Sequence, residues 1–170
     1  MGLESIQNDL LCQLREVAKQ KVNNNERFTE FTGIIGELAA CEAFGYKWVP
    51  GPGHDAFSEE EGEVQIKTRK VWVDGDRSKT FLNGRIGRFG RKGNYGFKTG
   101  VLVLLNDDFE IAEVWKARRE DIEDFEKMPN QTDKKGRELG LHVRTFIKKI
   151  PSEPVYHEDY IALERKLCWK

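Results

Sequence analysis

Two short segments of the sequence carry residue types that can hold a divalent cation and act on a phosphodiester. Asp55 supplies a carboxylate, and further along the chain Gln65 begins the pattern Gln-Ile-Lys. Gln65 and Lys67 are two positions apart, so their side chains share one face of a strand. The Asp55 carboxylate, the Gln65 amide oxygen and the main-chain carbonyl of Ile66 are hard oxygen ligands, which suit Mg²⁺ or Mn²⁺. Lys67 would lie beside the cation, where it can orient an attacking water or neutralise a pentavalent phosphate.

Two helices and a series of strands must position these residues. Apolar residues at helical spacing predict helices over residues 3–21 and about 26–44, and the second carries Glu37 beside an apolar stripe. Alternating polarity predicts a strand over 63–73, and the continuous apolar run at 101–105 predicts a central strand buried on both faces. Further elements are expected as strands at 46–49, 55–57, 110–117 and 142–147 and as helices at 118–127 and 157–167. This order predicts an α/β sandwich around a mixed sheet.

A basic, glycine-rich segment follows the predicted Gln-Ile-Lys strand. Residues 74–100 show little apolar periodicity, which predicts a long loop, and within 84–98 cations alternate with aromatic residues and glycine. Cations can bind phosphates and aromatic rings can stack on bases, so we expect this loop to contact nucleic acid and to be mobile without it. The predicted nucleic-acid-binding residues are Arg69, Arg85, Arg88, Arg91, Lys92 and Lys98.

Charge segregates along the chain, although the net charge is only −1. Residues 51–65 carry five acidic and no basic side chains, whereas residues 66–100 carry ten basic and two acidic side chains. An acidic stretch directly before a basic one favours a cation site beside a surface that binds a polyanion.

Length and composition exclude several classes of protein. The 170 residues predict a single domain, with a core at about 26–127 and additions at 3–21 and 141–170. No apolar run is long enough to span a membrane, and the N-terminus does not read as a signal peptide. The cysteines, Cys12, Cys41 and Cys168, are too far apart for a zinc site or a disulfide framework. We therefore expect a cytoplasmic protein with no membrane partner and no small-molecule cofactor.

These residues resemble the PD-(D/E)xK phosphodiesterase superfamily over roughly positions 26–117. Its pattern is an Asp at a strand start and an acidic residue, any residue and Lys on the next strand, often with a Glu on the preceding core helix. The run Gly33-Ile34-Ile35-Gly36-Glu37 is similar to that helix motif, and Gln65-Ile66-Lys67 is similar to the Gln-x-Lys variant of Mrr-type endonucleases. The sequence departs from the pattern at His54, which replaces Pro, and at Gln65, which replaces the acidic ligand. The second change removes one negative charge from the metal site, and Glu37 or Glu63 could compensate for it.

The resemblance implies a restriction-endonuclease-like fold, a three-layer α/β/α sandwich with a central mixed sheet. It also implies a Mg- or Mn-dependent DNA endonuclease, either type II restriction-like or Holliday-junction-resolvase-like, that works as a homodimer. Asp55, Gln65 and the Ile66 carbonyl would hold the metal, and Lys67 would activate water or stabilise the transition state. Glu37 would support a second metal or a water on the metal. Two alternatives remain open: a catalytically inactive nucleic-acid-binding module on the same fold, and a small interaction domain whose charged loop binds an acidic protein.

Overall fold

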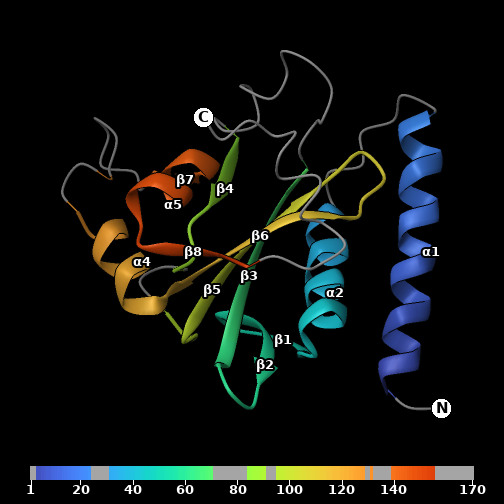
Figure 1. Cartoon of the computed structure of the whole chain (residues 1–170), viewed down its shortest axis with the longest axis horizontal. Helices are drawn as coiled ribbons and strands as arrows, with labels where there is room; N and C mark the ends of the chain where they lie inside the picture. The colour runs from blue at the N-terminus through green and yellow to red at the C-terminus, as the bar shows by residue number, and fades with distance from the viewer. Residues whose placement is uncertain are drawn as a thin grey trace.

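A six-stranded mixed sheet, ordered β1-β2-β3-β5-β6-β8, forms the centre of the computed structural model (Figure 1). The structure describes residues 3–23, 31–70, 84–90, 95–128, 131 and 139–155. The strands of this sheet are β1 (Lys47–Gly51), β2 (His54–Ser58), β3 (Gly62–Lys70), β5 (Thr99–Leu105), β6 (Ile111–Arg118) and β8 (Ser152–Val155). Neighbouring strands are antiparallel except β3 and β5, which are parallel. A small second sheet pairs β4 (Arg85–Gly87) with β7 (Leu141–His142).

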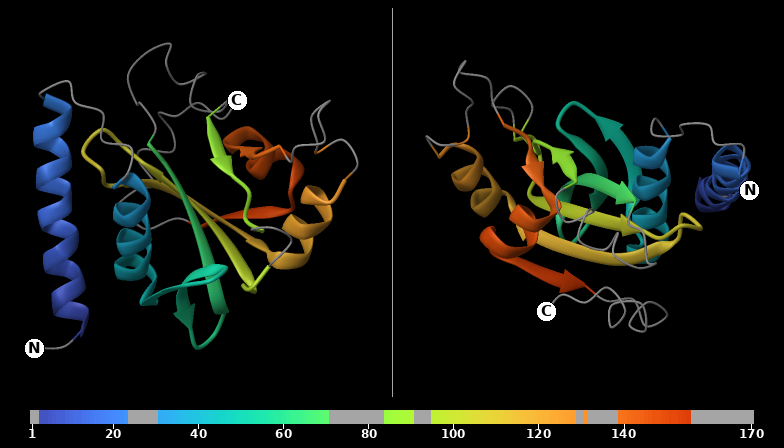
Figure 2. Two further views of the ribbon diagram at one scale, coloured as in Figure 1. Left: turned by 180° about the vertical axis from the view of Figure 1, so that it is seen from behind. Right: turned by 90° about the horizontal axis from the view of Figure 1, so that it is seen from above.

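Helices lie on both sides of the main sheet (Figure 2). On one side α2 (Thr32–Phe44) packs against β3, and α1 (Leu3–Asn23) packs against α2. On the other side lie α4 (Arg119–Glu126), α5 (Val143–Lys149) and the small sheet. The protein is thus a mixed α/β fold with a central mixed sheet, as the sequence predicted.

Strand β5 divides the hydrophobic core into two clusters. Val101, Val103 and Leu105 join the cluster on the α2 side, together with Ile66 of β3. The alternate residues Leu102 and Leu104 join the cluster on the α4–α5 side. Alternation along a strand explains this division, and it confirms that the apolar run is a strand buried on both faces.

The predicted strand at 142–147 is wrong, because most of this segment is helix α5. Val143, Phe146 and Ile150 are buried and Ile147 packs against the same cluster, so the apolar positions recur at helical spacing. The edge strand β8, which contains Pro154, follows it and was not predicted. The predicted terminal helix at 157–167 lies outside the described residues.

The aromatic residues of the predicted loop at 74–100 differ from expectation where the structure describes them. Phe89 and Phe97 are only 1% and 2% exposed, and Tyr95 is also buried. The ring of Phe89 stacks on Phe146 of α5 with centroids 5.1 Å apart. These aromatic residues therefore form part of the hydrophobic core and are not available to stack on bases. Residues 74–83 and 91–94 lie outside the described part of the chain.

The helices in the described part of the chain include none with the length and apolar character needed to cross a membrane.

Candidate active site

The site lies where β2 and β3 separate. The two strands pair from Ser58 opposite Gly62 to Ala56 opposite Val64. At the next position the Oδ2 atom of Asp55 accepts a hydrogen bond from the backbone N–H of Ile66 at 2.7 Å. The Asp55 carboxylate therefore takes the place of the β2 backbone as the partner of β3.

The same carboxylate oxygen also accepts a hydrogen bond from Nε2 of Gln65. The N–H and C=O of one residue lie at the same edge of an extended strand, so the Ile66 carbonyl faces the opening beside Asp55. The Ile66 side chain is buried on the α2 side of the sheet, which fixes the register of β3. A slip by one position would move Gln65 and Lys67 into that core.

Lys67 reaches the site from the opposite face of the sheet to α2. It pairs in register with Leu102 of β5, whose side chain belongs to the α4–α5 cluster. Arg69, two positions further, lies on the same face as Lys67 and is partly exposed.

Helix α2 brings Glu37 to the site through a close contact at Gly36. A Cβ atom on Gly36 would lie 2.0 Å from Oγ1 and 2.7 Å from Cβ of Thr68 on β3, so only glycine lets the helix approach this near. The neighbouring Glu37 accepts a hydrogen bond at Oε2 from Nε1 of Trp48, at 3.0 Å. Trp48 lies on β1, so the indole orients the carboxylate from the sheet edge.

The electrostatics of the site connect Glu37, Asp55 and Lys67. Burial raises the pKa of Glu37 above its ordinary value, the Trp48 hydrogen bond lowers it, the Asp55 charge raises it and the Lys67 charge lowers it. Burial also raises the pKa of Asp55, against the Ile66 hydrogen bond and the charge of Lys67, which lower it. The structure thus brings together two partly buried carboxylates and an ammonium group. When both carboxylates are ionised, the single charge of Lys67 balances one of them, and a further positive charge is needed to balance the other.

Cys41 lies near the two carboxylates without taking part in their chemistry. Burial, with the charges of Glu37 and Asp55, raises the pKa of its thiol to about 12. The thiol therefore stays protonated and contributes a neutral, apolar wall.

The oxygen atoms at the site suit a small divalent cation. Within the described ranges, no group of three or more His, Cys, Asp and Glu side chains is placed to hold a metal ion. Glu37 and Asp55 supply two carboxylates, and the Ile66 carbonyl faces the same opening. Rotation of the Gln65 amide would present its oxygen in place of Nε2. Because Mg²⁺ is commonly held by one or two carboxylates with waters and substrate phosphates, this donor set fits it.

No protein-family model matches the chain, and no curated protein matches it. The assignment of the site therefore depends on its residues and their geometry.

Glu63 and His54 lie close to the site in sequence but face other partners. The carboxylate of Glu63 lies 4.0 Å from Nζ of Lys98, and both side chains are substantially exposed. The His54 ring lies against Gly51 in the turn between β1 and β2, where a Cβ would come 3.0 Å from it. Its charge contributes to lowering the pKa of Asp55. Of the two carboxylates predicted to compensate for Gln65, Glu37 interacts electrostatically with Asp55, whereas Glu63 faces Lys98.

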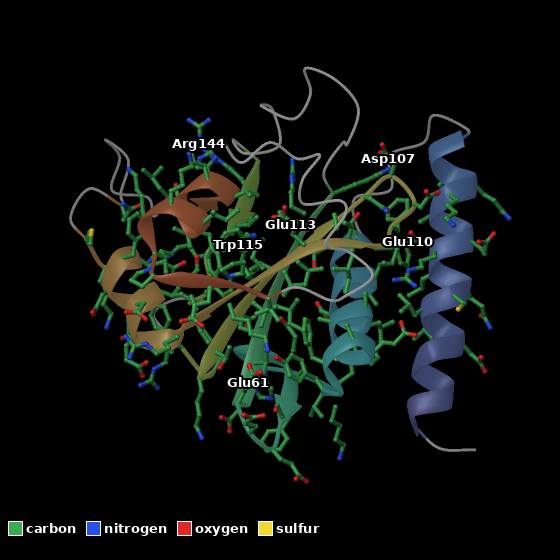
Figure 3. The ribbon with its side chains drawn as sticks, in the orientation of Figure 1. Glu61, Asp107, Glu110, Glu113, Trp115 and Arg144 are labelled. Atoms are coloured by element: carbon green, nitrogen blue, oxygen red, sulfur yellow. The ribbon has the colours of Figure 1, made fainter. Side chains whose placement is uncertain are left out.

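The acidic turn between β2 and β3 is anchored by Glu61, which Figure 3 labels, to β6 and to Tyr46 before β1. Oε1 of Glu61 lies 2.5 Å from Nζ of Lys116 on β6 and accepts a hydrogen bond from the Tyr46 hydroxyl at 2.8 Å. The Lys116 ammonium also lies over the rings of Phe44 and Tyr46. These contacts hold the beginning of β3, and with it the register of the site.

Arg88, which was predicted to bind nucleic acid, forms an ion pair with the buried Glu126. Its guanidinium donates to the backbone carbonyl of Glu126 at 2.9 Å, and its Nε lies 3.6 Å from the Glu126 carboxylate. That carboxylate, on a residue only 3% exposed, also accepts hydrogen bonds from the N–H groups of Phe89 and Gly90 and from the Tyr95 hydroxyl. Arg88 therefore helps to fix β4 to α4.

The predicted nucleic-acid contacts other than Arg69 and Arg88 fall into three groups. Arg85 on β4 is exposed. Lys98 is also exposed and faces Glu63. Arg91 and Lys92 lie outside the described residues.

Sequence reasoning missed three residues that shape the site and the face beside it: Gly36, Trp48 and Glu126. A glycine inside a helical pattern is a signal of close packing, so Gly36 could have been recognised. Trp48 gave no signal, because its role depends on the contact between β1 and α2. Glu126 is one of several acidic residues on α4, and only its burial distinguishes it.

Proposed function

We propose that this protein is a divalent-metal-dependent DNA endonuclease of the PD-(D/E)xK type. The observation that carries the proposal is the position of the Asp55 carboxylate. It spans the point where β2 and β3 separate, its charge raises the pKa of Glu37, and the charge of Lys67 lowers the pKa of both carboxylates. A paired carboxylate site beside an ammonium group is an arrangement suited to phosphodiester hydrolysis.

The proposal includes the finer fold assignment, a restriction-endonuclease-like sandwich. In its support, the helix that carries Glu37 precedes the strand with Asp55, and the strand with Lys67 comes next. The proposal also includes a location in the cytoplasm. It includes a homodimer as well, because one site cuts one strand at a time and a duplex has two strands.

Each residue has a distinct role in the proposed reaction. Glu37, Asp55, Gln65 and the Ile66 carbonyl would hold the cation. When bound, the cation would supply charge neutralisation and a lowered pKa for the attacking water. Lys67 would place its positive charge beside the phosphate that reacts, where negative charge grows in the transition state. Trp48 would keep the Glu37 carboxylate in place.

The test is incubation of the purified protein with supercoiled plasmid in the presence of Mg²⁺, Mn²⁺ or EDTA. We expect nicking or linearisation with either metal and none with EDTA. The Lys67→Ala variant should lose this activity, while Lys19→Ala, which removes a cation from α1 near Asp108, should retain it. Cleavage by Lys67→Ala at the wild-type rate would refute the proposal.

A second candidate is a catalytically inactive nucleic-acid-binding module. The neutral amide of Gln65, which donates to Asp55 where the superfamily pattern has an acid, favours it. That function predicts DNA binding that falls steeply with salt, and no cleavage with any metal. An interaction domain for an acidic protein predicts neither cleavage nor such binding to DNA.

A further inference from the structure

A basic groove lies between the small sheet and helices α4 and α5. Its volume is about 340 Å³. Phe125 and Leu141, both buried, contribute apolar surface, and the exposed cations Arg85 and Lys149 line the groove with the hydroxyl of Thr145. The other described residues that line it are Gln131, Leu139, Gly140 and His142.

The positive charge of this groove is uncompensated within the described part of the chain. Among the lining residues that the structure describes, none is Asp or Glu. Arg85 and Lys149 form no ion pair with any described residue, whereas Lys98, Arg118 and Lys127 all pair with carboxylates. Lys149 and Thr145 are four positions apart on α5, so their side chains lie on one side of the helix. Two cations and a hydroxyl are groups that bind a phosphate oxygen.

The groove lies on the same face of the main sheet as Lys67. Ile86 of β4 packs in the core cluster of Leu102 and Leu104, and Lys67 is the register partner of Leu102. Strand β4 also lies beside the second half of β3 in both views of the ribbon (Figures 1 and 2). Arg69 lies on this part of β3. Cations thus continue from the candidate active site across β3 and β4 to α5.

The β2–β3 turn, at the other end of the site from β4 and α5, is negatively charged. The β2–β3 turn carries the exposed Glu59 and Glu60, beside Glu61 and Glu63, which pair with Lys116 and Lys98. A polyanion that reaches Lys67 is therefore repelled by this turn and attracted toward β4 and α5.

We infer that the groove between β4, β7 and α5 binds a backbone phosphate of the DNA substrate, outside the site of cleavage. Arg85 and Lys149 make the ionic contacts, and Thr145 donates a hydrogen bond. This inference rests on the proposed function, because the DNA that occupies the groove is the DNA that is cut.

The test measures the salt dependence of DNA binding. The probe is a fluorescein-labelled 20-base-pair duplex, titrated in EDTA with protein carrying Lys67→Ala, so that no cleavage occurs. The variant Arg85→Ala/Lys149→Ala is compared with Arg144→Ala/Lys148→Ala. The control pair removes the same charge from exposed positions of α5 that do not line the groove, and Figure 3 shows Arg144 projecting outward.

Two lost phosphate contacts should flatten the slope of log affinity against log salt by about 1.8 and weaken binding roughly 30-fold at 0.15 M salt. The control pair should change the slope by less than half as much. The charge-preserving variant Arg85→Lys/Lys149→Arg should retain the wild-type slope, which separates loss of charge from misfolding. Equal slopes for the two alanine pairs, or weaker binding without a change in slope, would overturn the inference.

Cleavage of plasmid by the same variants, without Lys67→Ala, separates the two proposals. If the wild type cleaves and the two alanine pairs bind alike, the groove inference fails and the nuclease proposal stands. If the two alanine pairs differ in slope as expected but the wild type never cleaves, the nuclease proposal fails. The groove inference then stands for a binding module.

Discussion

Replacement of Gly36 by alanine tests whether the approach of α2 to β3 builds the site. The new Cβ would meet three atoms of Thr68, at 2.0 Å from Oγ1, 2.4 Å from Cγ2 and 2.7 Å from Cβ. Rotation of the Thr68 side chain cannot relieve the clash, because its own Cβ is fixed to the strand. To restore an ordinary contact of 3.4 Å, the helix must therefore move away by about 0.7 Å from the Thr68 Cβ, and by about 1.4 Å if the side chain keeps its rotamer.

This displacement should cost more activity than stability. Overpacking of this kind costs about 1–3 kcal/mol, and the better helix propensity of alanine offsets about 1 kcal/mol of it. We expect Gly36→Ala to lower the free energy of unfolding by about 0–2 kcal/mol. Displacement of Glu37 by about 1 Å should lower the cleavage rate by roughly 10²-fold. Urea unfolding and plasmid cleavage measure the two effects.

The same helix supplies the control. A Cβ on Gly33 would have no atom within 4 Å, so Gly33→Ala should leave cleavage unchanged. Adding Thr68→Ala to Gly36→Ala removes the two nearest atoms and leaves only the 2.7 Å contact, so the double variant should recover part of the activity. If Gly36→Ala behaves like Gly33→Ala in both assays, the close approach does not position Glu37, and the reasoning is refuted.

Three further predictions concern the carboxylates and Lys67. Asp55→Asn and Lys67→Ala should each lower the cleavage rate by about 10²-fold or more and retain DNA binding in an anisotropy assay, since both groups act on charge that develops in the reaction. The raised pKa values of Asp55 and Glu37 mean that, without metal, their contribution to stability is present below the ordinary values of 3.8 and 4.5 and is lost as the pH rises through the raised values. Mg²⁺ should therefore raise the Tm more at pH 8 than at pH 5, and an equal effect at both would contradict the assigned site. Glu126→Ala should destabilise the protein by about 3 kcal/mol or more in urea, because it removes the buried carboxylate that pairs with Arg88 and accepts hydrogen bonds from two buried N–H groups. Glu123→Ala, which breaks only surface ion pairs on α4, should cost about 1 kcal/mol or less.

The local part of the site could be predicted from the sequence. The spacing of Gln65 and Lys67 gives a shared face on any strand, and the apolar run at 101–105 indicates a central strand wherever it pairs. Gly45 ends α2 with a positive φ of 67°, the conformation that glycine after a helical pattern favours. Each of these predictions depends on neighbours in the chain alone.

The basic segment could not be predicted in the same way. Glycine, arginine and aromatic residues alternate there. The same pattern is compatible with rings that stack on bases and with rings that enter a core. Phe89 is buried because Phe146 covers it from α5, a helix that the sequence suggested as a strand. Arg88 is an internal residue because Glu126 lies beneath it. Both outcomes depend on contacts between segments far apart in the chain, which local pattern does not contain.

The short stretch of chain that holds the candidate site has a consequence for how the protein folds. Glu37, Asp55 and Lys67 lie on consecutive elements, and α2, β1, β2 and β3 contact one another directly. These contacts close small loops, so they cost little chain entropy and can form early. The pairing of residues 64–70 with 99–105 closes a much longer loop. The connection after Lys70 therefore governs how quickly the sheet is completed, whereas the residues of the site can meet one another before that connection closes.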